Sequence, residues 1–164
     1  MEKVRMGFIG CGGIANGKHL PAQKRNPVAE MVAFCDVIEE RAQKACKEYG
    51  APGAKVYTDY RELLKDKSID AVFVLTPNCS HCEIAVAALE AGKHVMCEKP
   101  MAMNYAEAKK MIAARDKSGK VLTIGYQNRY RPDSLYLKGQ AEAGMFGDIY
   151  YAEAIAVRRR AVPT

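Results

Sequence analysis

The sequence contains no uninterrupted apolar run of about 18 residues, which is the length that a membrane-spanning helix needs. It also shows no secretory signal, because Met1-Glu2-Lys3 leads directly into a short apolar segment without a separate leader. From these two absences we expect a cytoplasmic protein that has no membrane partner.

The sequence also lacks the groupings that mark several kinds of catalytic or metal site. No Ser/His/Asp arrangement, no catalytic pair of carboxylates and no cluster of metal ligands stands out in it. Six cysteines are present, but only Cys79 and Cys82 have a C-x-x-C spacing, and no second pair accompanies them. A single C-x-x-C is weak evidence for zinc or for a redox pair. We therefore expect no metal site, and reduced thiols that lie partly in the core.

Charge gives little sign of a nucleic-acid partner. Lys and Arg total 25 against 19 Asp and Glu, a net charge of +6 that is spread along the chain. The one compact basic cluster, Arg158-Arg159-Arg160, follows an alternating strand-like stretch and has no basic helix beside it. A nucleic-acid-binding protein would show a basic helix or face, so we expect no such partner. The 164 residues, 49% of them hydrophobic, suffice for one good core.

A glycine turn near the start is the most informative stretch. The sequence Gly10-x-Gly12-x-x-Ala15 follows an apolar strand-like segment and matches the dinucleotide-binding motif. Gly10 suits the tight turn, Gly12 lets a pyrophosphate approach the backbone, and Ala15 lets the helix pack closely on the strand. Gly13 and Ile14 begin a helix whose unpaired N–H groups attract phosphate. Alone, so short a motif also fits a glycine turn without a ligand.

A carboxylate, Asp36, ends the second apolar segment. It follows the glycine motif by about 20 residues, the distance at which dinucleotide-binding sheets hold the acid that accepts hydrogen bonds from the adenosine ribose. The other interpretation is an ordinary aspartate at a strand end. A carboxylate there repels a 2′-phosphate, so we expect NAD rather than NADP. Arg41, in the following helical segment, is of the type that reaches a 2′-phosphate, so NADP stays the alternative.

Apolar strand-like segments alternate with helical ones over most of the chain. The predicted strands cover residues 4–9, 29–36, 55–58, 70–75, 93–97 and 121–125. The predicted helices cover residues 14–25, 38–49, 60–65, 80–91 and 104–118. This alternation predicts a doubly wound parallel α/β sheet. Right-handed crossovers bring the carboxyl ends of its strands to one rim. That rim would hold Gly10–Gly13, Asp36, Thr76–Asn78, Glu98–Pro100 and Tyr126–Arg131.

The pattern changes after this sheet. Residues 132–144 are expected to form a helix and residues 148–157 a long strand with no partner after it. We therefore expect a dinucleotide-binding domain over 1–127. Residues 128–164 would supply a linker helix and the first strand of a truncated α+β domain for substrate binding and oligomerisation.

Lys99 is the strongest candidate for chemistry. It lies at a predicted strand end, and the following Pro100 holds its backbone extended. A lysine partly desolvated by a nicotinamide can exchange a proton with an alcohol or a carbonyl. The alternative is a surface lysine paired with an acid. His81 is placed to contact the cofactor or simply to begin a helix, while His19 and His94 carry no functional signal.

Several segments together resemble the Gfo/Idh/MocA oxidoreductases. They are Gly10-Cys11-Gly12-Gly13-Ile14-Ala15, Asp36, Thr76-Pro77-Asn78 with His81, Gly92-Lys93-His94-Val95, Glu98-Lys99-Pro100 and Gly125-Tyr126-Gln127-Asn128-Arg129. The resemblance covers the whole chain and implies a Rossmann domain that binds NAD(P). The Glu-Lys-Pro motif is the most specific part of it.

The resemblance also implies roles for individual residues. Thr76, Pro77, Asn78 and His81 would line the cofactor, and Glu98 would lie near the nicotinamide ribose. Lys99 would be the catalytic lysine, and Arg129 would lie near the cofactor or the substrate. In the family this lysine acts with an Asp-x-x-x-His pair in the second domain, which this sequence does not contain.

The expected function is hydride transfer between a nicotinamide cofactor and a sugar, a polyol or a related hydroxy compound. The full-length protein would be an NAD(P)-dependent dehydrogenase and a homo-oligomer, whereas the fragment alone would be inactive. Two alternatives remain: an NAD-dependent glycoside hydrolase, and a non-enzymatic regulator that only binds a dinucleotide.

Overall fold

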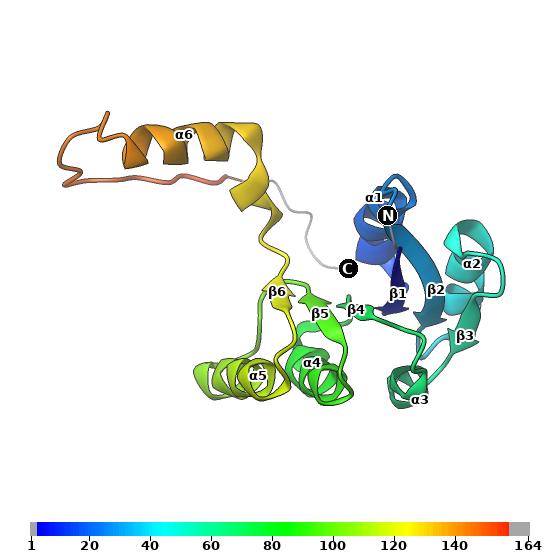
Figure 1. Cartoon of the computed structure of the whole chain (residues 1–164). Coiled ribbons are helices and arrows are strands. Elements are labelled where there is room, and N and C mark those ends of the chain that lie inside the picture. The colour runs from blue at the N-terminus through cyan, green and yellow to red at the C-terminus, as the bar shows by residue number, and fades with distance from the viewer. Residues whose placement is uncertain (1–2, 158–164) are drawn as a thin grey trace. The chain divides into compact units, whose positions relative to one another are not determined.

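The computed structural model describes residues 3–157. The chain divides into two compact units, Met1–Tyr126 and Gln127–Thr164, and each is described by itself (Figure 1). Among the described residues, no helix combines the length and the apolar character that crossing a membrane requires.

The first unit is built on a parallel sheet of six strands in the order β3-β2-β1-β4-β5-β6. The strands are β1 (Val4–Ile9), β2 (Ala29–Cys35), β3 (Lys55–Tyr57), β4 (Ala71–Val74), β5 (His94–Cys97) and β6 (Leu122–Ile124). Chain order reverses between β1 and β4, which is where open α/β sheets bind ligands. The expected doubly wound fold is confirmed.

Helices follow the strands as the alternation predicted. In the first unit they are η1 (Ala15–His19), α1 (Leu20–Lys24), α2 (Glu39–Tyr49), α3 (Tyr60–Lys65), η2 (Asn78–Ser80), α4 (His81–Glu90) and α5 (Tyr105–Ser118). Side-chain caps begin two of them, because Asp59 accepts the N–H of Arg61 at 2.8 Å and Asn104 accepts that of Glu107 at 3.0 Å. Helical backbone runs without a break from residue 13 to residue 24, although η1 within it has π-helical pairing.

The sheet lies between two apolar layers. On one face α1 and α2 cover a core around Phe8, Phe34 and Leu20, and on the other α3, α4 and α5 cover a core around Val72 and Leu89 (Figure 1). All five of these side chains are fully buried. Burial on both faces explains why the strands read as nearly continuous apolar runs instead of alternating ones.

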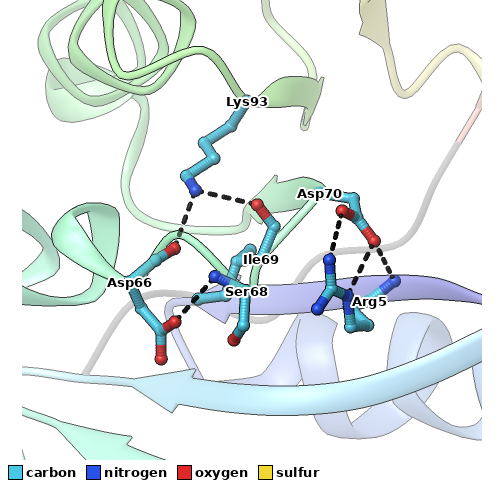
Figure 2. Close-up of polar contacts among 6 residues, drawn as sticks. All are labelled: Arg5, Asp66, Ser68, Ile69, Asp70 and Lys93. Atoms are coloured by element: carbon cyan, nitrogen blue, oxygen red, sulfur yellow. Dashed lines mark hydrogen bonds and ion pairs between the residues drawn. The ribbon is translucent and has the colours of Figure 1, made fainter.

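A polar cluster holds the amino ends of the strands, at the edge of the sheet opposite the predicted site. Figure 2 shows Lys93, just before β5, donating from Nζ to the carbonyl of Asp66 at 2.7 Å and to that of Ile69 at 2.8 Å. Arg5 of β1 binds both carboxylate oxygens of Asp70 through its guanidinium, at 3.2 and 3.1 Å. Burial lowers the pKa of Lys93, although Asp66 and Asp70 oppose the shift. Lys93 thus stabilises the loop that leads into β4.

We expect Lys93→Met to destabilise the first unit by about 2 kcal/mol, because it leaves buried carbonyls without their donor while keeping the apolar stem. The melting temperature should fall by about 6 °C in a thermal unfolding experiment. Lys67→Met is the matched control, since Lys67 is exposed in the same loop. An equal loss in both variants would contradict the role assigned to Lys93.

The second unit contains η3 (Gln127–Tyr130) and α6 (Pro132–Glu142). The strand predicted over residues 148–157 is wrong, because these residues pair with no strand and all of their side chains are exposed. Alternating apolar residues alone do not make a strand; a strand needs a hydrogen-bonding partner, and residues 3–157 offer this segment none. The first strand of a second domain is therefore absent from the described residues. The predicted basic cluster, Arg158-Arg159-Arg160, lies outside them.

Candidate functional site

Hydrogen bonds between neighbouring strands continue past the strand ends and build a rim there. The N–H of Gly10, after β1, donates to Cys35 O at 2.8 Å, and the N–H of Glu98, after β5, donates to Val74 O at 3.0 Å. The N–H of Leu75, after β4, donates to Ile9 O at 2.8 Å. This geometry brings the glycine turn, Asp36, the segment after β4 and Glu98 to the same edge of the sheet.

The glycine turn has one position that requires glycine and two that are open. Gly10 has φ +94°, and a Cβ there would lie 2.8 Å from the backbone carbon and oxygen of Leu75. At Gly12 and Gly13 a Cβ would meet nothing within 4 Å. Asn16, one helical turn further on, donates to Gly12 O at 2.9 Å and so closes the turn. The turn is thus rigid on its sheet side and free on its outer side.

Asp36 supports this turn from the next strand. Its Oδ2 accepts the N–H of Cys11 at 2.8 Å and its Oδ1 accepts the N–H of Ile38 at 3.0 Å. The residue is only 8% exposed. The sequence indicated a ribose ligand but not this second role, because spacing alone does not show which backbone groups a carboxylate reaches. Contact with a ribose stays a prediction, for which each oxygen retains a further lone pair.

The thiol inside the glycine motif is held in its protonated form. Burial, with the neighbouring Asp36 carboxylate, raises the pKa of Cys11 to about 12. Burial likewise raises the pKa values of Cys35 and Cys97 to about 12. All six cysteines are free, and the described part of the chain contains no group of three or more side chains that could hold a metal ion.

A cavity of about 690 Å³ lies at the point where the strand order reverses. Five predicted site residues line it: Gly10, Gly12, Asp36, Thr76 and Pro77. Further lining residues that the sequence analysis did not single out are Val37, Thr58, Tyr60, Arg61 and Ser80. They follow β2, β3 and β4, so the same argument from strand ends could have found them. The lining of the cavity is mainly apolar with a few polar groups, as in sites for small molecules and cofactors.

A smaller hollow of about 290 Å³ lies against the outer side of the glycine turn. Cys11, Gly12, Gly13 and Asn16 of the glycine turn and its helix line it, together with Arg41 and Lys44 of α2. Backbone N–H groups at the start of a helix together with two cationic side chains are suited to bind phosphate oxygens. Arg41 lines both the larger cavity and this hollow, so its positive charge lies beside each of them.

Glu98 and Lys99 lie on the rim but do not line either hollow. Glu98 is 7% exposed, and its carboxylate contacts His19 and the N–H of Lys99. The Lys99 side chain is exposed, and within residues 3–157 its Nζ makes no hydrogen bond or ion pair. The alternative of a surface lysine paired with an acid is therefore not seen, and Nζ is available to an incoming ligand.

His81 is fully buried at the start of α4. Its Nδ1 contacts Pro100 O at 2.8 Å and its Nε2 contacts Thr76 O at 3.0 Å. The ring thus joins the segment after β4 to the segment after β5, and both of its nitrogens face the chain itself. In this arrangement His81 holds these two segments together, and its contact with the cofactor stays a prediction.

The remaining predicted residues are exposed. Ile14, at 43% exposure, follows the glycine turn, and Asn78 begins η2 after Pro77. Arg129 lies in η3, in the second unit, and its contact with cofactor or substrate stays a prediction.

A parallel doubly wound sheet with a glycine turn and an acid after the neighbouring strand defines a dinucleotide-binding protein. Residues 4–126 match the model of the GFO_IDH_MocA family, described as an oxidoreductase family with an NAD-binding Rossmann fold. The chain belongs to this family, and the resemblance inferred from its motifs is confirmed.

Named relatives support the same assignment. The chain is 38% identical to D-glucoside 3-dehydrogenase of Escherichia coli over 160 residues, which are 98% of this chain and 45% of that protein. It resembles the WlbA dehydrogenase of Bordetella pertussis, solved with NADH and UDP-GlcNAcA, with a TM-score of 0.84 and 34% identity over 91% of this chain and 42% of that one. It also resembles KijD10, a 3-ketoreductase of Actinomadura kijaniata solved with NADP. That comparison gives a TM-score of 0.80 and 29% identity, and it covers 90% of this chain and 46% of KijD10. The chain spans less than half the length of these proteins.

Proposed function

We propose that this chain is the dinucleotide-binding part of an NAD-dependent dehydrogenase that acts on a hydroxyl group of a sugar, a polyol or a related compound. The observation that carries the proposal is the rim itself. It places a glycine turn with an open outer side, a buried aspartate and an exposed lysine at the carboxyl ends of β1, β2 and β5 in one parallel sheet. The relatives' names, which include a glucoside dehydrogenase, support the substrate class.

The residues present fit a dinucleotide. Gly12 and Gly13 leave space where any side chain would project, and Arg41 and Lys44 offer positive charge beside that space. Asp36 and the exposed Val37 line the larger cavity, which suits a ribose and an apolar base. Arg129, in the second unit, is proposed to contribute to cofactor or substrate binding, as the family resemblance implies.

When bound, the nicotinamide supplies the hydride acceptor or donor. The chain supplies the proton transfer: Lys99 Nζ in its neutral form accepts the hydroxyl proton as the carbinol carbon is oxidised, and returns it in the reverse direction. Glu98 and the Pro100 loop orient the lysine backbone. The substrate pocket and a second catalytic group are proposed to come from a domain that follows in the full-length protein. That protein is proposed to be cytoplasmic, in keeping with the six free cysteines of this chain. It is also proposed to be a homo-oligomer.

NADH is expected to raise the melting temperature of the chain by about 8 °C at about 100 times its Kd, because such binding stabilises the folded state by about 2.7 kcal/mol. NADPH should bind at least about 10-fold more weakly, because its 2′-phosphate would face the Asp36 carboxylate. Titrations that follow nicotinamide fluorescence measure both affinities. Failure of both nucleotides to bind would contradict the proposed function, and tighter binding of NADPH would contradict the NAD preference.

Arg41→Ala sharpens this comparison. Arg41 lines both hollows, and its charge favours a 2′-phosphate, so its removal should weaken NADPH binding more than NADH binding. Lys47→Ala is the matched control, since Lys47 lies on the same helix but lines neither hollow.

A further inference from the structure

A histidine on the helix of the glycine turn contacts the buried carboxylate next to the proposed catalytic lysine. His19 is the last residue of η1, and its Nε2 lies 2.7 Å from Glu98 Oε1, although the two residues are 79 positions apart in the sequence. Their side chains are only 15% and 10% exposed. A carboxylate oxygen accepts and does not donate, so His19 Nε2 carries the hydrogen of this bond.

The other carboxylate oxygen of Glu98 holds Lys99. Glu98 Oε2 accepts the backbone N–H of Lys99 at 2.9 Å. Both oxygens of the buried carboxylate are therefore engaged, one by the helix of the glycine turn and one by the lysine backbone. The Glu98 carboxylate is also closely packed against Gly125, since a Cβ at Gly125 would lie 3.2 Å from Glu98 Oε1.

The His19 ring is itself fixed by its surroundings. It packs edge-on against Phe73 of β4, with ring centroids 5.8 Å apart. The side chain is thereby directed across β4 toward the end of β5. A residue that served only to fill the apolar core would not need a polar atom at hydrogen-bond distance from a buried carboxylate.

We propose that His19 is a positioning residue for Lys99. It holds the Glu98 carboxylate, and through that carboxylate the backbone of Lys99, in one arrangement. The helix that begins at the glycine turn is thus coupled to the lysine on the far side of the site. This inference rests on the proposed dehydrogenase function for its catalytic consequence, but the structural link can be tested without any activity.

The structural test follows the backbone amide of Lys99 by ¹H–¹⁵N NMR on the 164-residue chain. His19→Leu should shift the Lys99 amide proton upfield, because the freed carboxylate no longer holds its hydrogen bond. His19→Gln should leave the resonance near its wild-type position, since the amide nitrogen of glutamine can occupy the place of Nε2. The matched control is His94→Gln, because His94 Nδ1 accepts the N–H of Val121 at 3.1 Å at the opposite end of β5. That variant should leave the Lys99 amide unchanged.

The catalytic test uses the same variants in the full-length protein. His19→Leu should lower kcat by about 10- to 100-fold while the KM for NAD stays within about twofold, because a small displacement of a catalytic group costs this much. His19→Gln should recover most of the loss. If His19→Leu does not fold, His19→Asn replaces it, because its shorter amide cannot reach Glu98.

Two results overturn the inference. One is an unmoved Lys99 amide in His19→Leu, and the other is a loss of kcat in His19→Gln equal to that in His19→Leu. The proposed function fails separately, if Lys99→Ala retains full activity whatever the His19 variants do. A shifted Lys99 amide together with a fully active Lys99→Ala variant would preserve the structural link and reject the catalytic role.

Discussion

Gly10→Ala is expected to lower the melting temperature of the chain by about 10 °C, which corresponds to a loss of about 3 kcal/mol in the free energy of unfolding. The new Cβ would lie 2.8 Å from the backbone of Leu75, and backbone cannot move aside as a flexible side chain can. The φ of +94° adds strain for any residue other than glycine. NADH binding should weaken as well, because the turn that presents the phosphate site is displaced.

Gly12→Ala should show the opposite pattern, although it changes the same turn by the same methyl group. Nothing in the chain lies within 4 Å of a Cβ at Gly12, so the melting temperature should change by no more than about 2 °C. The methyl group would occupy the space through which a pyrophosphate approaches the backbone, and NADH affinity should fall at least about 10-fold.

Thermal unfolding without ligand and a fluorescence titration with NADH separate the two effects. Gly17→Ala is the control, since a Cβ there is also unobstructed but lies within the helix, beyond the turn. It should leave NADH affinity unchanged and raise the melting temperature by about 2–3 °C, because alanine stabilises a helix interior by about 0.5–1 kcal/mol relative to glycine. If Gly12→Ala bound NADH as well as wild type does, the glycine turn would not be the pyrophosphate site. If Gly10→Ala were as stable as wild type, the close approach to Leu75 would not matter.

The parts of the fold that could be predicted are those that local sequence determines. The apolar runs 29–36 and 70–75 predicted strands because burial on both faces of a parallel sheet requires continuous apolar residues. Gly10 and Asp36 predicted a binding edge because strand ends in such a sheet share one side. Residues 148–157 have similar strand-like residues, yet they form no strand, since the alternation carries no information about a partner.

The contacts that could not be predicted join residues far apart in the chain. His19 showed no functional signal, because its contact with Glu98 spans 79 positions and depends on the packing of η1 against β4. The burial of His81 between the carbonyls of Thr76 and Pro100 has the same origin. In both cases the residue type was visible but its neighbours were not. The motif residues therefore predict the site, while the residues proposed to orient it emerge only from the folded chain.

Lys99→Ala in the full-length protein is expected to lower kcat by about 10²- to 10⁴-fold, the range that a positioned acid–base group contributes. The KM for NAD should stay within a few-fold, because Lys99 lines neither the larger cavity nor the hollow at the glycine turn. The side chain is exposed and its Nζ has no partner in the part of the chain that the structure describes, so stability should change by no more than about 0.5 kcal/mol.

Lys93 provides the control for this prediction, because the two lysines flank the same strand. Lys93→Met removes a buried ammonium group at the amino end of β5 and should lower stability while leaving kcat within about twofold. Lys99→Arg separates charge from proton transfer: arginine keeps the positive charge but does not give up its proton, so it should be nearly as inactive as Lys99→Ala. Full activity of Lys99→Arg would mean that the site needs only a cation at this rim, and that another group moves the hydroxyl proton.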